Sequence, residues 1–168
     1  PLPAFCDMRL AVDVMRSLPE GTVLLGMEAA GRHHTLNLAS DYPHVAAAGE
    51  TGCGKSVLAC VVGVQVLMSG GRVVILDIKG SHRWARALVD GGGVTYCRKV
   101  ESIHDMLVSL GAERERRCDT AWTEDTLTFP RVLIIFEELG STLEMLAAHW
   151  QVIKEKDDPK LSTAIAAY

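Results

Sequence analysis

A closely spaced group of glycines, a lysine and a serine occupies residues 49–56, in the run GETGCGKS. Gly49 and Gly54 stand five positions apart and are followed directly by Lys55 and Ser56, which fits the spacing G-x-x-x-x-G-K-[ST]. Backbone N–H groups must converge on phosphate oxygens in such a loop, and glycines leave room for this because they carry no side chain. Lys55 is then expected to reach the β- and γ-phosphates, and the Ser56 hydroxyl to ligate Mg²⁺.

The residues around this run favour the same chemistry. Residues 44–49 (HVAAAG) are predicted to form a short apolar strand, and residues 55–68 a buried helix that ends at a glycine pair. The positive end of that helix would point at the phosphates. Cys53 lies at a variable position of the pattern, so we interpret it as a residue without a chemical role of its own, with a redox role as the alternative. The residues expected to bind the nucleotide are Gly49, Glu50, Thr51, Gly52, Cys53, Gly54, Lys55, Ser56 and Val57.

Two adjacent carboxylates follow an apolar run in RVLIIFEELG, residues 131–140. Hydrolysis of a bound triphosphate needs one group to hold the metal and its water shell and another to position the attacking water. Phe136 cannot bind a metal, so we assign Glu137 to the metal and Glu138 to the attacking water. The predicted catalytic residues are therefore Lys55 and Glu138, and the predicted metal ligands are Ser56 and Glu137. A helix-capping or surface acidic pair is the alternative.

Strand-like and helix-like segments alternate along the rest of the chain, which predicts an α/β fold with a mostly parallel sheet. A lead-in of residues 1–40 precedes the main domain of residues 41–168, which we expect to be a partial P-loop ATPase core. The further elements expected are a helix at 5–18, a hairpin of strands 22–27 and 34–39, strands at 72–80, 94–97 and 131–140, and helices at 81–90, 100–118 and from a capping box at Ser141 to about residue 156.

Composition excludes several classes of protein. The chain has 168 residues, of which 48% are hydrophobic and 23% charged, with a net charge of -4. This balance is typical of a soluble globular domain and gives no direct sign of nucleic-acid binding, although a motor can concentrate its contacts on a few loops. The five cysteines form no CxxC pair, which argues against a disulfide framework or a zinc site. No apolar run reaches the length of a membrane span, so we expect a cytoplasmic protein, with any membrane association through segments outside this chain.

Several stretches, taken together, resemble the FtsK-type DNA translocases of the FtsK/HerA superfamily. They are PHVAAAGETGCGKS (43–56), ILDIKG (75–80), ERERRC (113–118) and FEEL (136–139). The resemblance covers roughly residues 20–150 and looks closest to the translocases of actinomycete conjugative plasmids and their phage-borne relatives. It implies a RecA-like core, use of ATP with Mg²⁺, assembly into a homo-hexameric ring and movement along double-stranded DNA. It also implies a further central strand, an arginine finger and DNA-facing loops after the acidic strand, none of which we find here. We therefore expect an incomplete domain that is inactive on its own.

Some residues and functions stay open at this point. Asp77 and Lys79 are either a surface pair or a group that couples the nucleotide to a neighbouring subunit. Arg114, Arg116 and Arg117 either contact phosphate or form a solvated face with local Glu–Arg pairs. The alternative functions are a secretion-type coupling ATPase that moves single-stranded DNA or protein, and a nucleotide-dependent scaffold. The histidines show no ligand spacing and are interpreted as surface or packing residues: His33, His34, His44, His82, His104 and His149.

Overall fold

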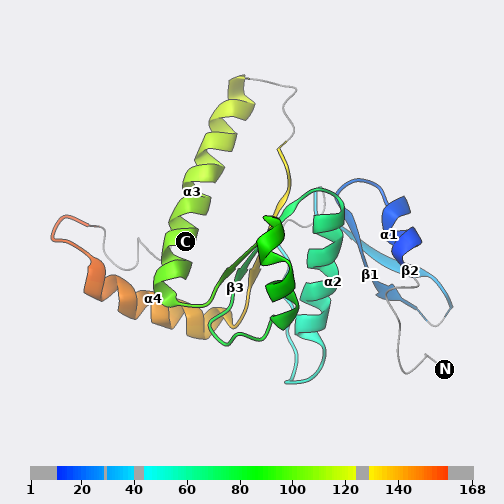
Figure 1. Cartoon of the computed structure of the whole chain (residues 1–168), viewed down its shortest axis with the longest axis horizontal. Helices are drawn as coiled ribbons and strands as arrows, with labels where there is room; N and C mark the ends of the chain where they lie inside the picture. Colours follow the sequence, from blue (N-terminus) through cyan, green and yellow to red (C-terminus); the bar gives the residue numbers. More distant parts are fainter. Residues whose placement is uncertain (1–10, 29, 40–43, 124–128, 159–168) are drawn as a thin grey trace. The chain divides into compact units, whose positions relative to one another are not determined.

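The computed structural model describes residues 11–28, 30–39, 44–123 and 129–158, which form an α/β fold (Figure 1). The chain divides into two compact units, residues 1–73 and 74–168, and the division falls within strand β3. The described elements are α1 (Val12–Ser17), β1 (Thr22–Met27), β2 (His33–Asn37), α2 (Lys55–Met68), β3 (Arg72–Leu76), the 3₁₀ helices η2 (Arg83–Ala87) and η3 (Val89–Gly91), β4 (Val94–Cys97), α3 (Val100–Thr123), β5 (Val132–Phe136) and α4 (Leu139–Ile153).

The first unit is built on a hairpin and one helix. Strands β1 and β2 pair antiparallel, with a register shift between Leu24 and Gly26, and helix α2 packs against β1. Gln65 of α2 is buried and forms hydrogen bonds with both backbone groups of Leu24: its Oε1 accepts from Leu24 N at 2.7 Å and its Nε2 donates to Leu24 O at 2.9 Å. The side chain thereby satisfies backbone groups beside the irregularity and fixes the helix to the strand.

Helix α2 has the bounds that the sequence predicts. It begins after Gly54, whose φ of 97° requires a residue without a Cβ, and it ends at Met68, two residues before Gly70, which has a φ of 79°. Gly71 N donates to Val66 O at 2.9 Å and Gly70 N to Leu67 O at 3.0 Å, which are the two hydrogen bonds of a Schellman motif.

The second unit is a three-stranded parallel sheet in the order β4-β3-β5, covered by α3 and α4. Asp77 N donates to Cys97 O and Glu137 N to Leu76 O, so the carboxyl ends of the three strands lie at one edge. Because β3 is the central strand, its side chains Val74 and Leu76 are buried. The core contains Val74, Leu76, Cys97, Ile103 and Leu146, with Ile78, Val100, Met106, Leu107, Leu110, Val132, Phe136 and Leu143 packed around it.

Three predictions about elements are wrong, and a fourth is tested only in part. Residues 44–50 form no strand and are exposed, because a strand requires a hydrogen-bonded neighbour and none of the described strands pairs with them. The predicted helix at 81–90 is a pair of 3₁₀ helices, and Ser141 is not a cap because α4 already begins at Leu139, after Glu138. The helix predicted at 5–18 is described only in part, and its segment 12–17 is helical.

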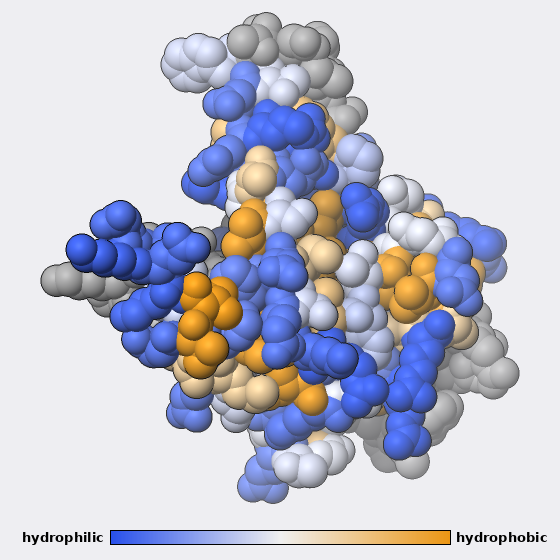
Figure 2. All heavy atoms as spheres, turned by 60° about the vertical axis from the view of Figure 1, so that its left-hand side comes forward, coloured by the Kyte–Doolittle hydropathy of each residue, from blue (hydrophilic) through white to orange (hydrophobic). Residues whose placement is uncertain are grey.

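The surface is mostly polar on the face that Figure 2 presents, with smaller apolar areas between the polar ones. Exposed apolar side chains include Trp122 of α3, Val152 and Leu139 of α4, and Val57 of α2. Within the described ranges, no helix is both long and apolar enough to cross a bilayer. Four described cysteines are free thiols, namely Cys53, Cys60, Cys97 and Cys118.

Candidate nucleotide-hydrolysis site

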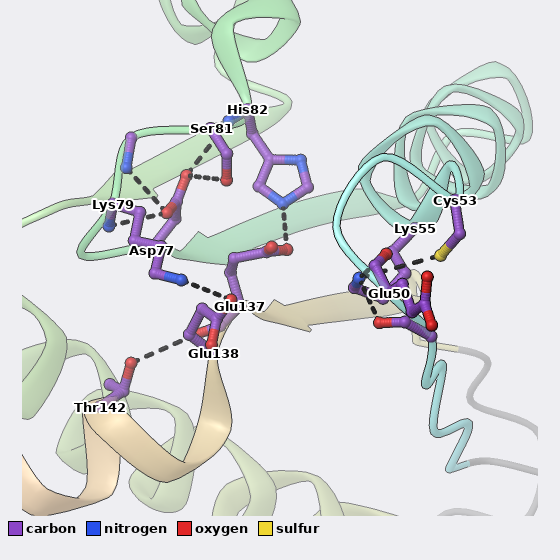
Figure 3. Close-up of polar contacts among 12 residues, drawn as sticks. Glu50, Cys53, Lys55, Asp77, Lys79, Ser81, His82, Glu137, Glu138 and Thr142 are labelled. Atoms are coloured by element: carbon purple, nitrogen blue, oxygen red, sulfur yellow. Dashed lines mark hydrogen bonds and ion pairs between the residues drawn. The ribbon is translucent and has the colours of Figure 1, made fainter.

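The glycine-rich loop in the first unit is folded around the ammonium group of Lys55. Lys55 Nζ donates to Gly49 O at 2.8 Å and to Glu50 O at 3.0 Å, and lies 3.8 Å from Cys53 Sγ (Figure 3). A loop whose carbonyl groups turn inward onto a lysine holds a positive charge at its centre. That charge, next to the amino-terminal end of α2, is the arrangement a polyphosphate needs.

Glycine is required at two positions in this loop. Gly52 and Gly54 have φ values of 87° and 97°, which other residues rarely adopt. At Gly49, a Cβ would lie 2.6 Å from Cys53 Sγ, which is the end of an exposed side chain that can turn away. Ser56 is half-buried in the first turn of α2, and Val57 beside it is 67% exposed. The backbone conformation therefore explains the glycines at positions 52 and 54.

The two predicted acidic residues lie at the carboxyl end of β5 in the second unit, in different environments. The Glu137 side chain is 16% exposed and the Glu138 side chain 40% exposed. Glu137 N still donates to Leu76 O at 2.9 Å, so Glu137 continues the sheet ladder. Glu138 has a φ of 49° and a ψ of 57°, the left-handed conformation, and it is the residue at which the chain turns into α4.

Thr142 of α4 holds this turn through two hydrogen bonds. The residue is fully buried, its Oγ1 donates to Glu137 O at 3.2 Å and its N–H donates to Glu138 O at 3.0 Å. A left-handed conformation costs a non-glycine residue roughly 1–2 kcal/mol, so surrounding contacts must maintain it. The strained turn places the side chains of Glu137 and Glu138 against different partners.

Asp77 organises the loop of residues 77–82, which follows the central strand β3. Its buried carboxylate accepts five hydrogen bonds. Oδ1 accepts from the N–H groups of Lys79 at 3.0 Å and Gly80 at 2.8 Å. Oδ2 accepts from Ser81 Oγ at 3.2 Å, His82 N at 3.1 Å and Tyr96 OH at 2.7 Å. Loop 77–82 is therefore wound around one carboxylate.

The pKa values of Asp77 and Tyr96 reflect this arrangement. Burial by itself would raise the pKa of Asp77, but the hydrogen bonds from Tyr96, His82 and Gly80 outweigh it and hold the pKa below its ordinary value. Burial, together with the bond to the Asp77 carboxylate, raises the pKa of Tyr96 to about 12. Both groups therefore keep one protonation state around neutral pH, and Asp77 has a structural role rather than that of an exposed surface acid.

Loop 77–82 contacts both predicted acidic residues. Lys79 Nζ lies 2.5 Å from Glu138 Oε1, and His82 Nε2 lies 2.9 Å from Glu137 Oε2 (Figure 3). Sequence reasoning placed Lys79 at the strand end but treated His82 as a surface or packing residue. The contact with Glu137 links positions far apart in the chain, so no local pattern could have indicated it.

The arginine run lies within α3, which continues beyond the predicted end at Cys118 to Thr123, and it forms local contacts. Arg116 and Arg117 both pair with Glu113 at 2.7 Å, and both guanidinium groups lie over the ring of Phe129, at 5.4 and 5.2 Å from its centroid. The two arginines lower the pKa of Glu113 to about 2. Arg117 also donates to Pro130 O at 2.9 Å, which ties α3 to the segment before β5. These contacts agree with the interpretation of a local Glu–Arg network.

The chemistry of these residues fits a magnesium nucleotide. Mg²⁺ keeps several waters and is bound by one or two protein oxygens together with substrate phosphates, so it needs no dedicated cage of side chains. In the part of the chain that the structure describes, no three His, Cys, Asp or Glu side chains form such a cage. Ser56 and Glu137 each offer one oxygen ligand, the former at the head of α2 and the latter at the end of β5.

Comparison with known proteins gives one family and one fold. Residues 31–156 match the family model described as the central domain of helicase HerA. A solved structure, that of the pCW3 conjugation coupling protein TcpA in a monomer form with ATPγS, matches with a TM-score of 0.65 at 20% sequence identity. The match covers 92% of this chain and 44% of TcpA, so the chain spans less than half the length of that protein. No curated protein matches the sequence.

Proposed function

The chain belongs to the family of the HerA helicase central domain, within the FtsK/HerA superfamily, and we propose that it is the ATP-driven motor domain of a translocase for double-stranded DNA. The observation that carries this proposal is the loop folded around the Lys55 ammonium, in a chain whose residues 31–156 match this family. Residues 41–168 would form the ATPase core, residues 1–40 the lead-in, and the whole protein a homo-hexameric ring.

Each side chain has a distinct task in this proposal. Lys55 would exchange its carbonyl contacts for phosphate oxygens, and residues 49–57 would surround the nucleotide with backbone N–H groups. Ser56 and Glu137 would hold Mg²⁺, which neutralises charge on the phosphates. Glu138 would accept a proton from the attacking water, and its carboxylate lies beside the Lys79 ammonium group.

Two substitutions in the protein that carries this chain test the assignment. Lys55→Ala is expected to weaken nucleotide binding, which a fluorescent ATP analogue measures directly. Glu138→Gln is expected to leave binding intact and to slow hydrolysis by roughly 10²–10⁴-fold, the scale of one acid–base group. Glu115→Ala, at an exposed position of α3, serves as the control for general effects. Normal hydrolysis by both variants would refute the site.

The likeness to a conjugation coupling protein supports one alternative, a pump for single-stranded DNA or protein. The two functions differ in what stimulates ATP turnover. A duplex translocase is stimulated by double-stranded DNA, whereas the alternative predicts stimulation by single strands or by a protein substrate. ATP binding without turnover under any of these conditions would instead indicate a nucleotide-dependent scaffold.

A further inference from the structure

His82 is a fully buried side chain whose ring contacts polar groups at both nitrogens. Nε2 lies 2.9 Å from Glu137 Oε2, and Nδ1 lies 3.1 Å from Trp84 Nε1 (Figure 3). The rings of His82 and Trp84 are nearly perpendicular, with an interplanar angle of 85°. A buried imidazole between an indole and a carboxylate is more than a packing residue, because each contact constrains the position of its hydrogen.

The indole determines which tautomer the imidazole adopts. Trp84 Nε1 carries a hydrogen and can only donate, so His82 Nδ1 must accept. The ring is then neutral with its hydrogen on Nε2, and that hydrogen is donated to Glu137 Oε2. The opposite tautomer would place two donors together at Trp84 and two acceptors together at Glu137.

The backbone of His82 is held as firmly as its ring. His82 N donates to Asp77 Oδ2 at 3.1 Å, and the same carboxylate oxygen accepts from Tyr96 OH. The imidazole is therefore positioned from the end of the central strand β3, directly beside the strand that carries Glu137. It offers Glu137 a rigid donor rather than a mobile one.

We propose that His82, with its tautomer set by Trp84, is a positioning residue that orients the Glu137 carboxylate toward the metal. This rests on the metal role of Glu137 in the proposed function. Glutamate has one more rotatable bond than aspartate, and a fixed donor on Oε2 removes most of that freedom and directs Oε1 to the metal or a metal-bound water. Partners of this kind typically change metal affinity by 10–100-fold when removed.

The test measures Mn²⁺ affinity by electron paramagnetic resonance in the presence of ATPγS, on the protein that carries this chain. His82→Leu is expected to weaken Mn²⁺ binding by about tenfold, with the affinity for metal-free nucleotide unchanged. His82→Gln can present an N–H group at a similar distance, so it is expected to retain most of the Mn²⁺ affinity of the unmodified protein. Trp84→Phe keeps an aromatic ring but removes the donor, so it should weaken binding by a smaller factor. His33→Leu, at an exposed position of β2, is the matched control.

A double substitution separates this inference from the proposed function. If His82 acts through Glu137, then His82→Leu adds nothing to the loss already caused by Glu137→Gln. A full additional loss in that background refutes positioning. If Glu137→Gln weakens Mn²⁺ binding but His82→Leu and Trp84→Phe do not, the positioning role alone is wrong. If Glu137→Gln itself has no effect, the metal role of Glu137 and the inference built on it both fail.

The tautomer can be observed without any activity measurement. Nitrogen-15 chemical shifts of the His82 ring should show hydrogen on Nε2 and an accepting Nδ1 in the unmodified protein. Trp84→Phe should change that pattern, because Nδ1 loses its donor. A ring that carries its hydrogen on Nδ1, or on both nitrogens around neutral pH, would contradict the proposal.

Discussion

Replacing Asp77 with asparagine tests how far loop 77–82 depends on one carboxylate. Asparagine has nearly the same size but no charge, and an NH₂ group takes the place of one oxygen. Its remaining oxygen can still accept hydrogen bonds from the N–H groups of Lys79 and Gly80, as Oδ1 does now. The new NH₂ group then faces Ser81 Oγ, His82 N and Tyr96 OH, all of which now donate to Oδ2.

The three donors differ in how they can respond. The Ser81 and Tyr96 hydroxyl groups can rotate and accept, but the N–H of His82 cannot. A buried donor without a partner costs about 1–3 kcal/mol, and the bonds that remain lose the strength that a charged acceptor gave them. We therefore expect Asp77→Asn to lower the free energy of unfolding by about 2–4 kcal/mol.

The pH dependence provides an independent readout of the same carboxylate. The pKa of Asp77 in the folded protein lies below its ordinary value, so its charged form stabilises the fold. That contribution is fully present above the ordinary aspartate pKa and is lost as pH falls through the lower folded-state pKa. Stability of the unmodified protein should therefore decline with acid in this range, and the decline should be shallower in Asp77→Asn.

Urea unfolding followed by tryptophan fluorescence, from about pH 7 to about pH 3, measures both effects. Lys79→Met is the matched control in the same loop, because its ion pair with Glu138 joins side chains that are 56% and 40% exposed. Such pairs contribute at most about 1 kcal/mol. The reasoning is refuted if Asp77→Asn stays within about 0.5 kcal/mol of the unmodified protein, or if its pH profile is unchanged.

Three further substitutions or titrations follow from local geometry. Gly54→Ala should weaken binding of a fluorescent ATP analogue by about tenfold, roughly 1.4 kcal/mol, because its φ of 97° lies in the left-handed region that costs a non-glycine residue about 1–2 kcal/mol. The free energy of unfolding of Glu138→Gly should exceed that of Glu138→Ala by about 1 kcal/mol, because both lose the Lys79 ion pair but only glycine suits the left-handed φ of 49°. Equal urea midpoints for the two variants would count against the turn geometry. Carbon-13 titration should give Glu113 a pKa of about 2 and show it rising toward the ordinary range in about 0.5 M salt, because the pair is screened there.

Local signals in the sequence determine the elements that could be predicted. Helix α2 is bounded by glycines whose positive φ values start and stop it, so its limits follow from residue types alone. The hairpin of β1 and β2 and the short strand β4 follow from apolar and β-branched runs between turn residues. The acidic residues at the end of β5 could also be predicted, because the apolar run of residues 132–136 is followed directly by two glutamates.

Features that depend on distant partners could not be predicted in this way. The apolar run at residues 44–49 resembles a strand, but none of the described strands pairs with it. The capping box at Ser141 satisfies a pattern, but the left-handed turn at Glu138 starts α4 earlier. His82 lies 55 residues from Glu137 in sequence, so its contact arises only when β3 and β5 pair.

The two acidic residues are adjacent in sequence, yet the sheet gives them different chemistry. Glu137 remains in the β3–β5 ladder and accepts a hydrogen bond from a neutral, buried imidazole. Glu138 leaves the ladder through a strained turn and pairs with an exposed ammonium group. The Glu137 carboxylate therefore has a buried, uncharged donor as its partner, whereas the Glu138 carboxylate has an exposed, charged one. Because both partners come from loop 77–82, a movement of the end of β3 would alter the contacts of Glu137 and Glu138 together.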